Sequence, residues 1–92
     1  MRSEPVEIYS DQTNAAVMRH PGRRFPGVLI QGDSLSTLCA DADEICERIG
    51  RGGEGFEEAN ELRNVLWSYL THYKTVLAEH GLPLPFSDRE KP

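Results

Sequence analysis

The spacing of apolar residues changes about one third of the way along the chain. Before that point, residues 6–9 alternate between apolar and polar, and residues 28–31 are almost continuously apolar. Alternation is typical of a strand with one covered face, and a continuous run is typical of a central strand. Residues 15–18 fit either another strand or the start of a short helix. We therefore expect a small sheet of two or three strands.

Turn residues separate these runs. Two Pro-Gly pairs, at residues 21–22 and 26–27, enclose Arg23, Arg24 and Phe25. Pro-Gly predicts a turn because proline fixes φ and glycine accommodates a positive φ. The sheet is therefore expected to be antiparallel, with a charged loop before its last strand.

After residue 33 the apolar residues recur at every third or fourth position, which is the spacing of one helix face. The two apolar stripes comprise, up to residue 49, Leu35, Leu38, Ala42, Ile45 and Ile49, and, from about residue 56 to 80, Ala59, Leu62, Leu66, Tyr69, Tyr73 and Val76, widened by Val65, Leu70 and Leu77. The glycine-rich residues 50–55 interrupt the helical pattern, and Gly81 is a natural helix stop. Two helices joined by a short loop predict an antiparallel hairpin.

Together these elements predict an α+β fold: a small antiparallel sheet of two or three strands, followed by an antiparallel two-helix hairpin packed on it. A chain of 92 residues can bury one modest core, so residues 1–86 are expected to form a single domain. Within it, Leu82, Leu84 and Phe86 alternate with prolines, and residues 82–86 are expected to run extended across the edge of the core. Residues 87–92 are expected to be a disordered tail.

Charge is distributed unevenly along the chain. The net charge is −5, yet residues 1–32 carry four arginines against three acids, whereas residues 33–80 carry ten acids against four Lys or Arg. Phosphate binding requires Lys and Arg, so such helices are not expected to bind nucleic acid. No apolar run approaches the roughly 18 residues of a membrane span, and the N-terminus lacks the apolar segment of a signal peptide. We expect a cytoplasmic protein without a membrane partner.

The cysteines and histidines do not have the spacing of a metal site. Cys39 and Cys46 are seven residues apart, which in a helix separates their α-carbons by about 10 Å. A disulfide needs about 4.4–6.8 Å, so we expect two small buried thiols. His20, His72 and His80 form no zinc-ligand motif with them. No metal and no cofactor are expected.

Residues 32–36, Gly-Asp-Ser-Leu-Ser, follow the apolar run and resemble the first block of the GDSL esterases, which implies Ser34 as a nucleophile. That family also has a later Asp-x-x-His that supplies the base, and this sequence contains none. A serine without a base is not a catalyst, and Asp33 and Ser34 are preferred residues at helix starts. We therefore interpret the segment as a helix cap and expect no enzymatic activity.

The one concentrated basic feature is the loop with Arg19, Arg23 and Arg24. Guanidinium groups pair well with carboxylates and phosphates, so the loop is a candidate anion-binding site. The alternative is a solvated turn whose arginines pair with the acids of the helices. Charged turns are common, which favours the solvated turn, although loops are also where functional residues concentrate.

A second candidate surface lies on the helices. On a helical wheel Trp67 falls off the apolar stripe, near Arg63 and Lys74, and a tryptophan beside an arginine is typical of a protein interface. The alternative is that the sheet edge or residues 82–86 cover the indole. The acids of the first helix are either a solvated face or a site for a basic partner. They are Asp41, Asp43, Glu44 and Glu47.

The stretch from Ile8 to Leu35 resembles a family of small uncharacterised bacterial proteins. The resemblance is carried by Tyr-Ser-Asp at 9–11, Asn-Ala-Ala-Val at 14–17, the Pro-Gly-Arg-Arg-Phe-Pro-Gly loop at 21–27 and the Val-Leu-Ile-Gln-Gly-Asp-Ser-Leu run that follows it. That family has no established activity. The resemblance implies a bacterial origin and marks the loop as the family signature.

These observations favour a small cytoplasmic protein-interaction module, of the immunity or inhibitor type, with an unidentified protein partner. The alternative is a small regulatory or ligand-binding domain, as a monomer or a homodimer, in which residues 19–24 hold an anion.

Overall fold

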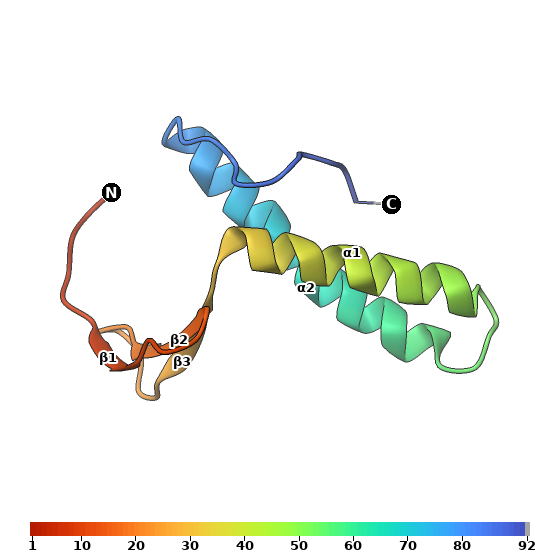
Figure 1. Cartoon of the computed structure of the whole chain (residues 1–92), viewed down its shortest axis with the longest axis horizontal. Coiled ribbons are helices and arrows are strands. Elements are labelled where there is room, and N and C mark those ends of the chain that lie inside the picture. Colours follow the sequence, from red (N-terminus) through yellow and green to blue (C-terminus); the bar gives the residue numbers. More distant parts are fainter. Residues whose placement is uncertain (92) are drawn as a thin grey trace. The chain divides into compact units, whose positions relative to one another are not determined.

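The computed structural model describes residues 1–91 and contains a sheet followed by two helices (Figure 1). In chain order the elements are β1 (Glu7–Ser10), β2 (Ala15–Arg19), β3 (Gly27–Ile30), α1 (Gly32–Ile49) and α2 (Phe56–Glu79). They form two compact units, a sheet unit up to Gln31 and a hairpin unit from Gly32 onward. The predicted α+β class is confirmed. The packing of the hairpin on the sheet, and a single domain over residues 1–86, stay predictions.

The sheet unit is a three-stranded antiparallel meander in the order β1-β2-β3. Residues 15–18 therefore belong to a strand and not to a helix. The expectation that residues 28–31 form the central strand is wrong, because in a three-stranded meander the middle strand of the sequence is the middle strand of the sheet. β3 is an edge strand, and its residues Val28 and Leu29 are 61% and 53% exposed.

The loop before β3 contains a tight turn. The carbonyl of His20 accepts a hydrogen bond of 2.9 Å from the N–H of Arg23, and the ring Nδ1 of His20 accepts one of 3.1 Å from the N–H of Gly22. The turn does not use the positive φ that the Pro-Gly pairs predict, since in the described residues positive φ occurs at other glycines. Pro21 supplies the fixed φ of a type I turn instead.

Glycines set both ends of the second helix. Gly50, Gly52 and Gly55 have φ between 76° and 85° and turn the chain from α1 into α2. At the other end Gly81 has a φ of 66°, and the N–H groups of Gly81 and Leu82 donate to the carbonyls of Ala78 and Leu77. These two hydrogen bonds define a Schellman motif. The predicted helix stop at Gly81 is confirmed.

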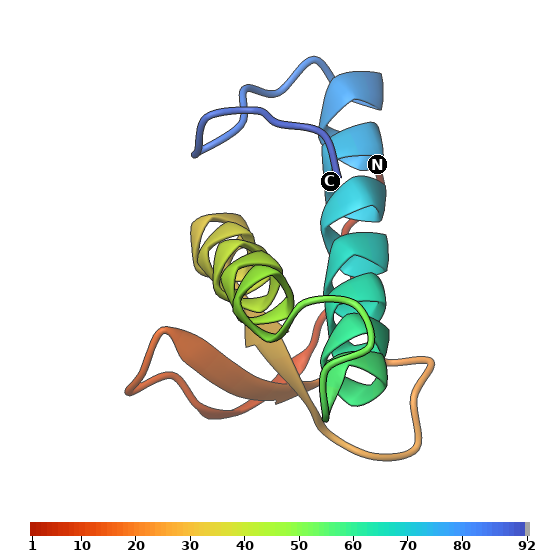
Figure 2. The same ribbon diagram turned by 90° about the vertical axis from the view of Figure 1, so that its right-hand side faces the viewer.

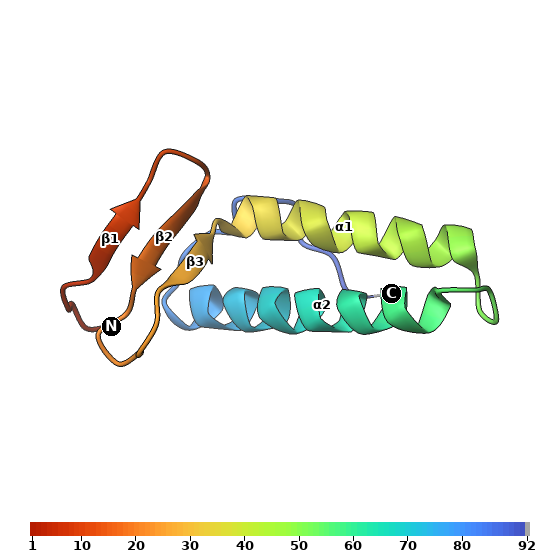
Figure 3. The same ribbon diagram turned by 90° about the horizontal axis from the view of Figure 1, so that it is seen from below.

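α1 and α2 lie side by side in opposite directions (Figure 3), as predicted. Their core contains Leu35, Cys39, Trp67 and Leu70, with Leu66 and Phe86 packed against it. Trp67 and Leu70 are each 1% exposed, and burial of one such side chain stabilises a fold by about 1.5–3 kcal/mol. The core therefore combines Leu35 and Leu66, from one edge of the apolar stripes, with Cys39 and Trp67, which lie beside the stripes.

The start of α1 lies very close to α2. A Cβ atom built on Gly32 would be 2.3 Å from the ring carbon Cζ of Tyr73. A side chain at position 32 would therefore collide with a half-buried aromatic ring. This glycine is required by close packing and not by its backbone angles.

The residues after Gly81 run along one side of the hairpin (Figure 2). Leu84 and Phe86 are half-buried, and the rings of Phe86 and Tyr73 are 6.2 Å apart. The segment continues with side-chain contacts from residues 87–91, which lie in the tail that the sequence suggests is disordered. Pro92 lies outside the described residues.

Candidate functional site

One side of the hairpin unit is apolar and uncovered. We call it the hairpin face, and it consists of Leu38 (41% exposed) and Ile45 (49%) on α1 and Leu62 (56%), Val65 (42%) and Tyr69 (60%) on α2. Residues three, four or seven apart share one side of a helix. Each helix therefore presents several large apolar side chains that its own unit leaves exposed.

Helix geometry places this face away from the tail. The tail contacts Asp43 on α1 and Asn64 on α2. At about 100° per residue, Ile45 lies roughly 160° around the helix from Asp43, and Leu62 lies roughly 160° from Asn64. The hairpin and its tail thus use one edge of each apolar stripe and leave the other edge open.

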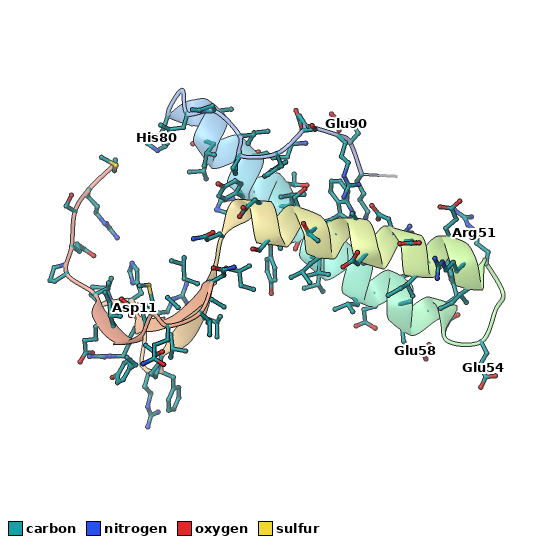
Figure 4. The ribbon with its side chains drawn as sticks, in the orientation of Figure 1. Asp11, Arg51, Glu54, Glu58, His80 and Glu90 are labelled. Atoms are coloured by element: carbon teal, nitrogen blue, oxygen red, sulfur yellow. The ribbon has the colours of Figure 1, made fainter. Side chains whose placement is uncertain are left out.

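Two acidic side chains, Asp41 and Glu58, border the hairpin face. Asp41 lies four residues before Ile45, and Glu58 lies four residues before Leu62 and projects outward from α2 (Figure 4). Both are exposed, and neither belongs to an ion pair within residues 1–91. Glu44 is exposed too, but it pairs with Arg48 at 2.6 Å. Glu47 is also exposed, but it lies roughly 160° around the helix from Ile45 and does not border the hairpin face.

Trp67 does not contribute to an exposed surface. Its Nε1 donates a hydrogen bond of 3.0 Å to Oδ1 of Asp43, and the guanidinium of Arg89 lies 4.7 Å from the centre of its ring. Nη1 of Arg89 donates to Oδ2 of the same carboxylate at 2.8 Å. The indole is therefore covered, as in the alternative to an interface tryptophan, but the covering side chain is Arg89 and not one of residues 82–86. Arg89 is the residue that the sequence did not reveal.

Arg63 and Lys74 are also engaged within the hairpin unit. Nη2 of Arg63 donates to Oδ1 of Asn60 at 2.6 Å, and the side chain is half-buried. Nζ of Lys74 pairs with Asp88 at 2.6 Å and donates to the carbonyl of Arg89 at 3.0 Å. In the flank that the sequence suggested as a partner site, the tail thus covers Trp67 and Lys74, whereas Arg63 is held by Asn60 of its own helix.

In the sheet unit the three nominated arginines differ. Arg19 pairs with Glu7, which raises the pKa of the Arg19 guanidinium. Arg23 and Arg24 have no acidic partner within residues 1–91. Arg24 lies 5.3 Å from the ring centre of Phe25, which is 71% exposed. Two cationic groups therefore remain available beside an exposed aromatic ring.

A hollow of about 550 Å³ lies next to these arginines in the sheet unit. Apolar and polar side chains both contribute to its lining. The lining residues are Val6, Met18, His20, Arg23, Arg24, Phe25, Gly27, Val28 and Leu29.

The Gly-Asp-Ser segment and the two cysteines are parts of the first helix. Oδ1 of Asp33 accepts a hydrogen bond of 2.9 Å from the N–H of Ser34, so the Gly-Asp-Ser segment begins a helix. Cys39 and Cys46 are free and buried, and burial raises the pKa of the Cys39 thiol. No group of three metal-ligating side chains occurs in the described part of the chain. No helix there has the length and apolarity to cross a membrane.

Comparison with known proteins identifies a family. No curated protein and no solved structure matches the chain. A family model matches residues 1–86, which is almost the whole sequence. The chain belongs to the family of unknown function DUF6959.

Proposed function

We propose that this protein is a small interaction module of the immunity or inhibitor type, which binds a partner protein through the hairpin face. The supporting observation is that the hairpin and its tail cover only one edge of the two apolar stripes. The other edge leaves Leu62 and Tyr69 more than half exposed. Contiguous apolar surface surrounded by polar residues is typical of a binding site for another protein.

The charge around the face favours a basic partner. Residues 33–80 carry ten acids against four Lys or Arg, and Asp41 and Glu58 at the rim have no partner within residues 1–91. Charge complementarity steers association and selects among partners. An amphipathic helix with basic flanks matches both features, since it places apolar side chains at three- and four-residue spacing on such a face.

The expected strength of this interaction is moderate. Covering the exposed half of a leucine or isoleucine side chain contributes about 1 kcal/mol, and Tyr69 adds an aromatic anchor of the kind that dominates many interfaces. This surface replaces the Trp67 flank as the proposed partner site. Among the acids nominated from the sequence, Asp41 lies beside the face, whereas Asp43 binds Trp67 and Arg89.

We infer a bacterial, cytoplasmic protein without enzymatic activity, in a family whose signature is the loop of residues 21–27. The absence of an Asp-x-x-His partner for Ser34 in the sequence supports a non-catalytic role.

Affinity capture from a lysate of the host, with three versions of the chain, tests the proposed function. The partner is expected to be retained by the parent chain and lost with Leu62→Glu. It is expected to be retained by Ala40→Glu too, because this exposed position of α1 lies roughly 140° around the helix from Ile45. Circular dichroism checks that each variant stays helical. A partner that is retained equally by all three versions would contradict the proposal. Capture of more copies of the same chain, lost with Leu62→Glu, would assign the face to a homodimer instead.

A further inference from the structure

The hollow in the sheet unit is lined by two chemically different groups of side chains. One group is apolar and includes Met18 and Leu29, and the other includes the guanidinium side chains of Arg23 and Arg24. Its volume of about 550 Å³ lies within the roughly 300–1,000 Å³ of sites that hold small molecules.

Strand register explains why the hollow is apolar. Ala16 is opposite Leu29 and Met18 is opposite Gly27, and residues directly opposite each other share a face of the sheet. Ala16 and Met18 are two residues apart on one strand and therefore also share a face. Met18 and Leu29 thus belong to the same face.

Gly27 creates the space. A Cβ atom built at this position would have no atom within 4 Å, and the φ angle of Gly27 is not in the positive range. The backbone therefore does not require a glycine here. The missing side chain opposite Met18 leaves room that a β-branched residue would partly occupy.

The two arginines supply the charge. Arg19 is neutralised by Glu7, whereas Arg23 and Arg24 have no acidic partner among residues 1–91. A guanidinium binds a carboxylate with strong, charge-assisted hydrogen bonds. An occupant with one anionic group and an apolar body would satisfy both groups of lining side chains.

From this arrangement we propose that the sheet unit binds a medium-chain carboxylate, with its head group at Arg23 and Arg24 and its hydrocarbon chain along Met18 and Leu29. The site lies in a different unit from the hairpin face. The two proposals can therefore fail independently.

Isothermal titration calorimetry with decanoate, below its micelle concentration, tests this site. Decanol serves as the uncharged probe and inorganic phosphate as the anion without a chain. Decanoate is expected to bind at least about tenfold more tightly than either probe, because each lacks one of the two required interactions. Equal affinity for decanol would overturn the role of the arginines, and equal affinity for phosphate would overturn the role of the apolar wall.

Variants locate the bound molecule. Gly27→Val places a branched side chain, which is suited to a strand, in the hollow opposite Met18, and it is expected to weaken decanoate binding at least about tenfold. The double variant Arg23→Gln with Arg24→Gln is expected to weaken binding about tenfold. Arg51→Gln, an exposed arginine in the loop between the helices (Figure 4), is the matched control and should leave binding unchanged. Unchanged binding by Gly27→Val, with its strand signal by circular dichroism intact, would overturn the proposal.

Discussion

Asp43 connects the buried indole of the hairpin unit to its tail. One carboxylate oxygen accepts from Trp67, and the other accepts from Arg89. The sequence places Asp43 in a row of acids on the first helix, and nothing in that row distinguishes it from Asp41. The difference arises from a residue 46 positions further along the chain, and helical periodicity contains no information about such a contact.

Asp43→Ala is therefore expected to lower the free energy of unfolding by about 1–3 kcal/mol, because Trp67 Nε1 loses its acceptor and Arg89 loses its counter-charge. Asp41→Ala is the matched control, since Asp41 is exposed and lies on the same helix. It should change stability by less than about 0.5 kcal/mol. Urea unfolding followed by tryptophan fluorescence measures both. Similar effects of the two substitutions would contradict the assigned role of Asp43.

Gly32→Ala tests the close approach at the start of α1. Alanine has a higher helix propensity than glycine, so propensity alone predicts stabilisation. The Cβ atom would, however, lie 2.3 Å from the Tyr73 ring, and such overpacking is expected to cost about 1–3 kcal/mol. Ser34→Ala in the same turn is the control. Thermal unfolding followed by the helical circular dichroism signal should show a lower midpoint for Gly32→Ala and an unchanged one for Ser34→Ala. A raised midpoint for Gly32→Ala would contradict the expected collision with Tyr73.

Among the elements, the helices and strands follow from apolar spacing, but their packing does not. The periodicity predicts where α1 and α2 lie and that Gly81 ends α2. It also predicts stripes that include Leu38 and Leu62, which are exposed, and it excludes Trp67, which is buried. The apolar stripe on each helix is wider than the area that the neighbouring helix can cover. The sequence therefore does not specify which edge of the stripe is buried. In this hairpin the tail and the neighbouring helix bury the edge of the stripe that lies next to Trp67.

Removal of residues 87–92 tests the tail as an element. Trp67 is the one tryptophan of the sequence, so the fluorescence emission of the protein reports directly on the solvent exposure of this side chain. Without Arg89 above the ring, the emission maximum is expected to move to longer wavelength and acrylamide quenching to increase. A chain in which residues 87–92 are replaced by Gly-Ser repeats of equal length keeps the length but not the contacts, and it should behave like the truncation. Unchanged emission would favour the disordered tail that the sequence suggests.

For the whole molecule, the two units offer surfaces of opposite character. The sheet unit carries two arginines without acidic partners beside an apolar hollow, whereas the hairpin unit carries an apolar face with acidic neighbours. The distribution of Lys, Arg, Asp and Glu along the sequence already shows that the N-terminal part is slightly basic and that the helical part is acidic. It does not predict that Arg19 is neutralised by Glu7 or that the tail covers the Trp67 flank. These depend on strand register and on a long-range contact.

The most direct test of the hairpin face uses two designed amphipathic helical peptides of about five turns. They share the same leucine face and differ in whether their flanks carry lysine or glutamate. Fluorescence anisotropy is expected to show at least about tenfold tighter binding of the lysine peptide, and Leu62→Glu should abolish that binding while Ala40→Glu preserves it. Equal binding of the two peptides, or binding that survives Leu62→Glu, would contradict the account.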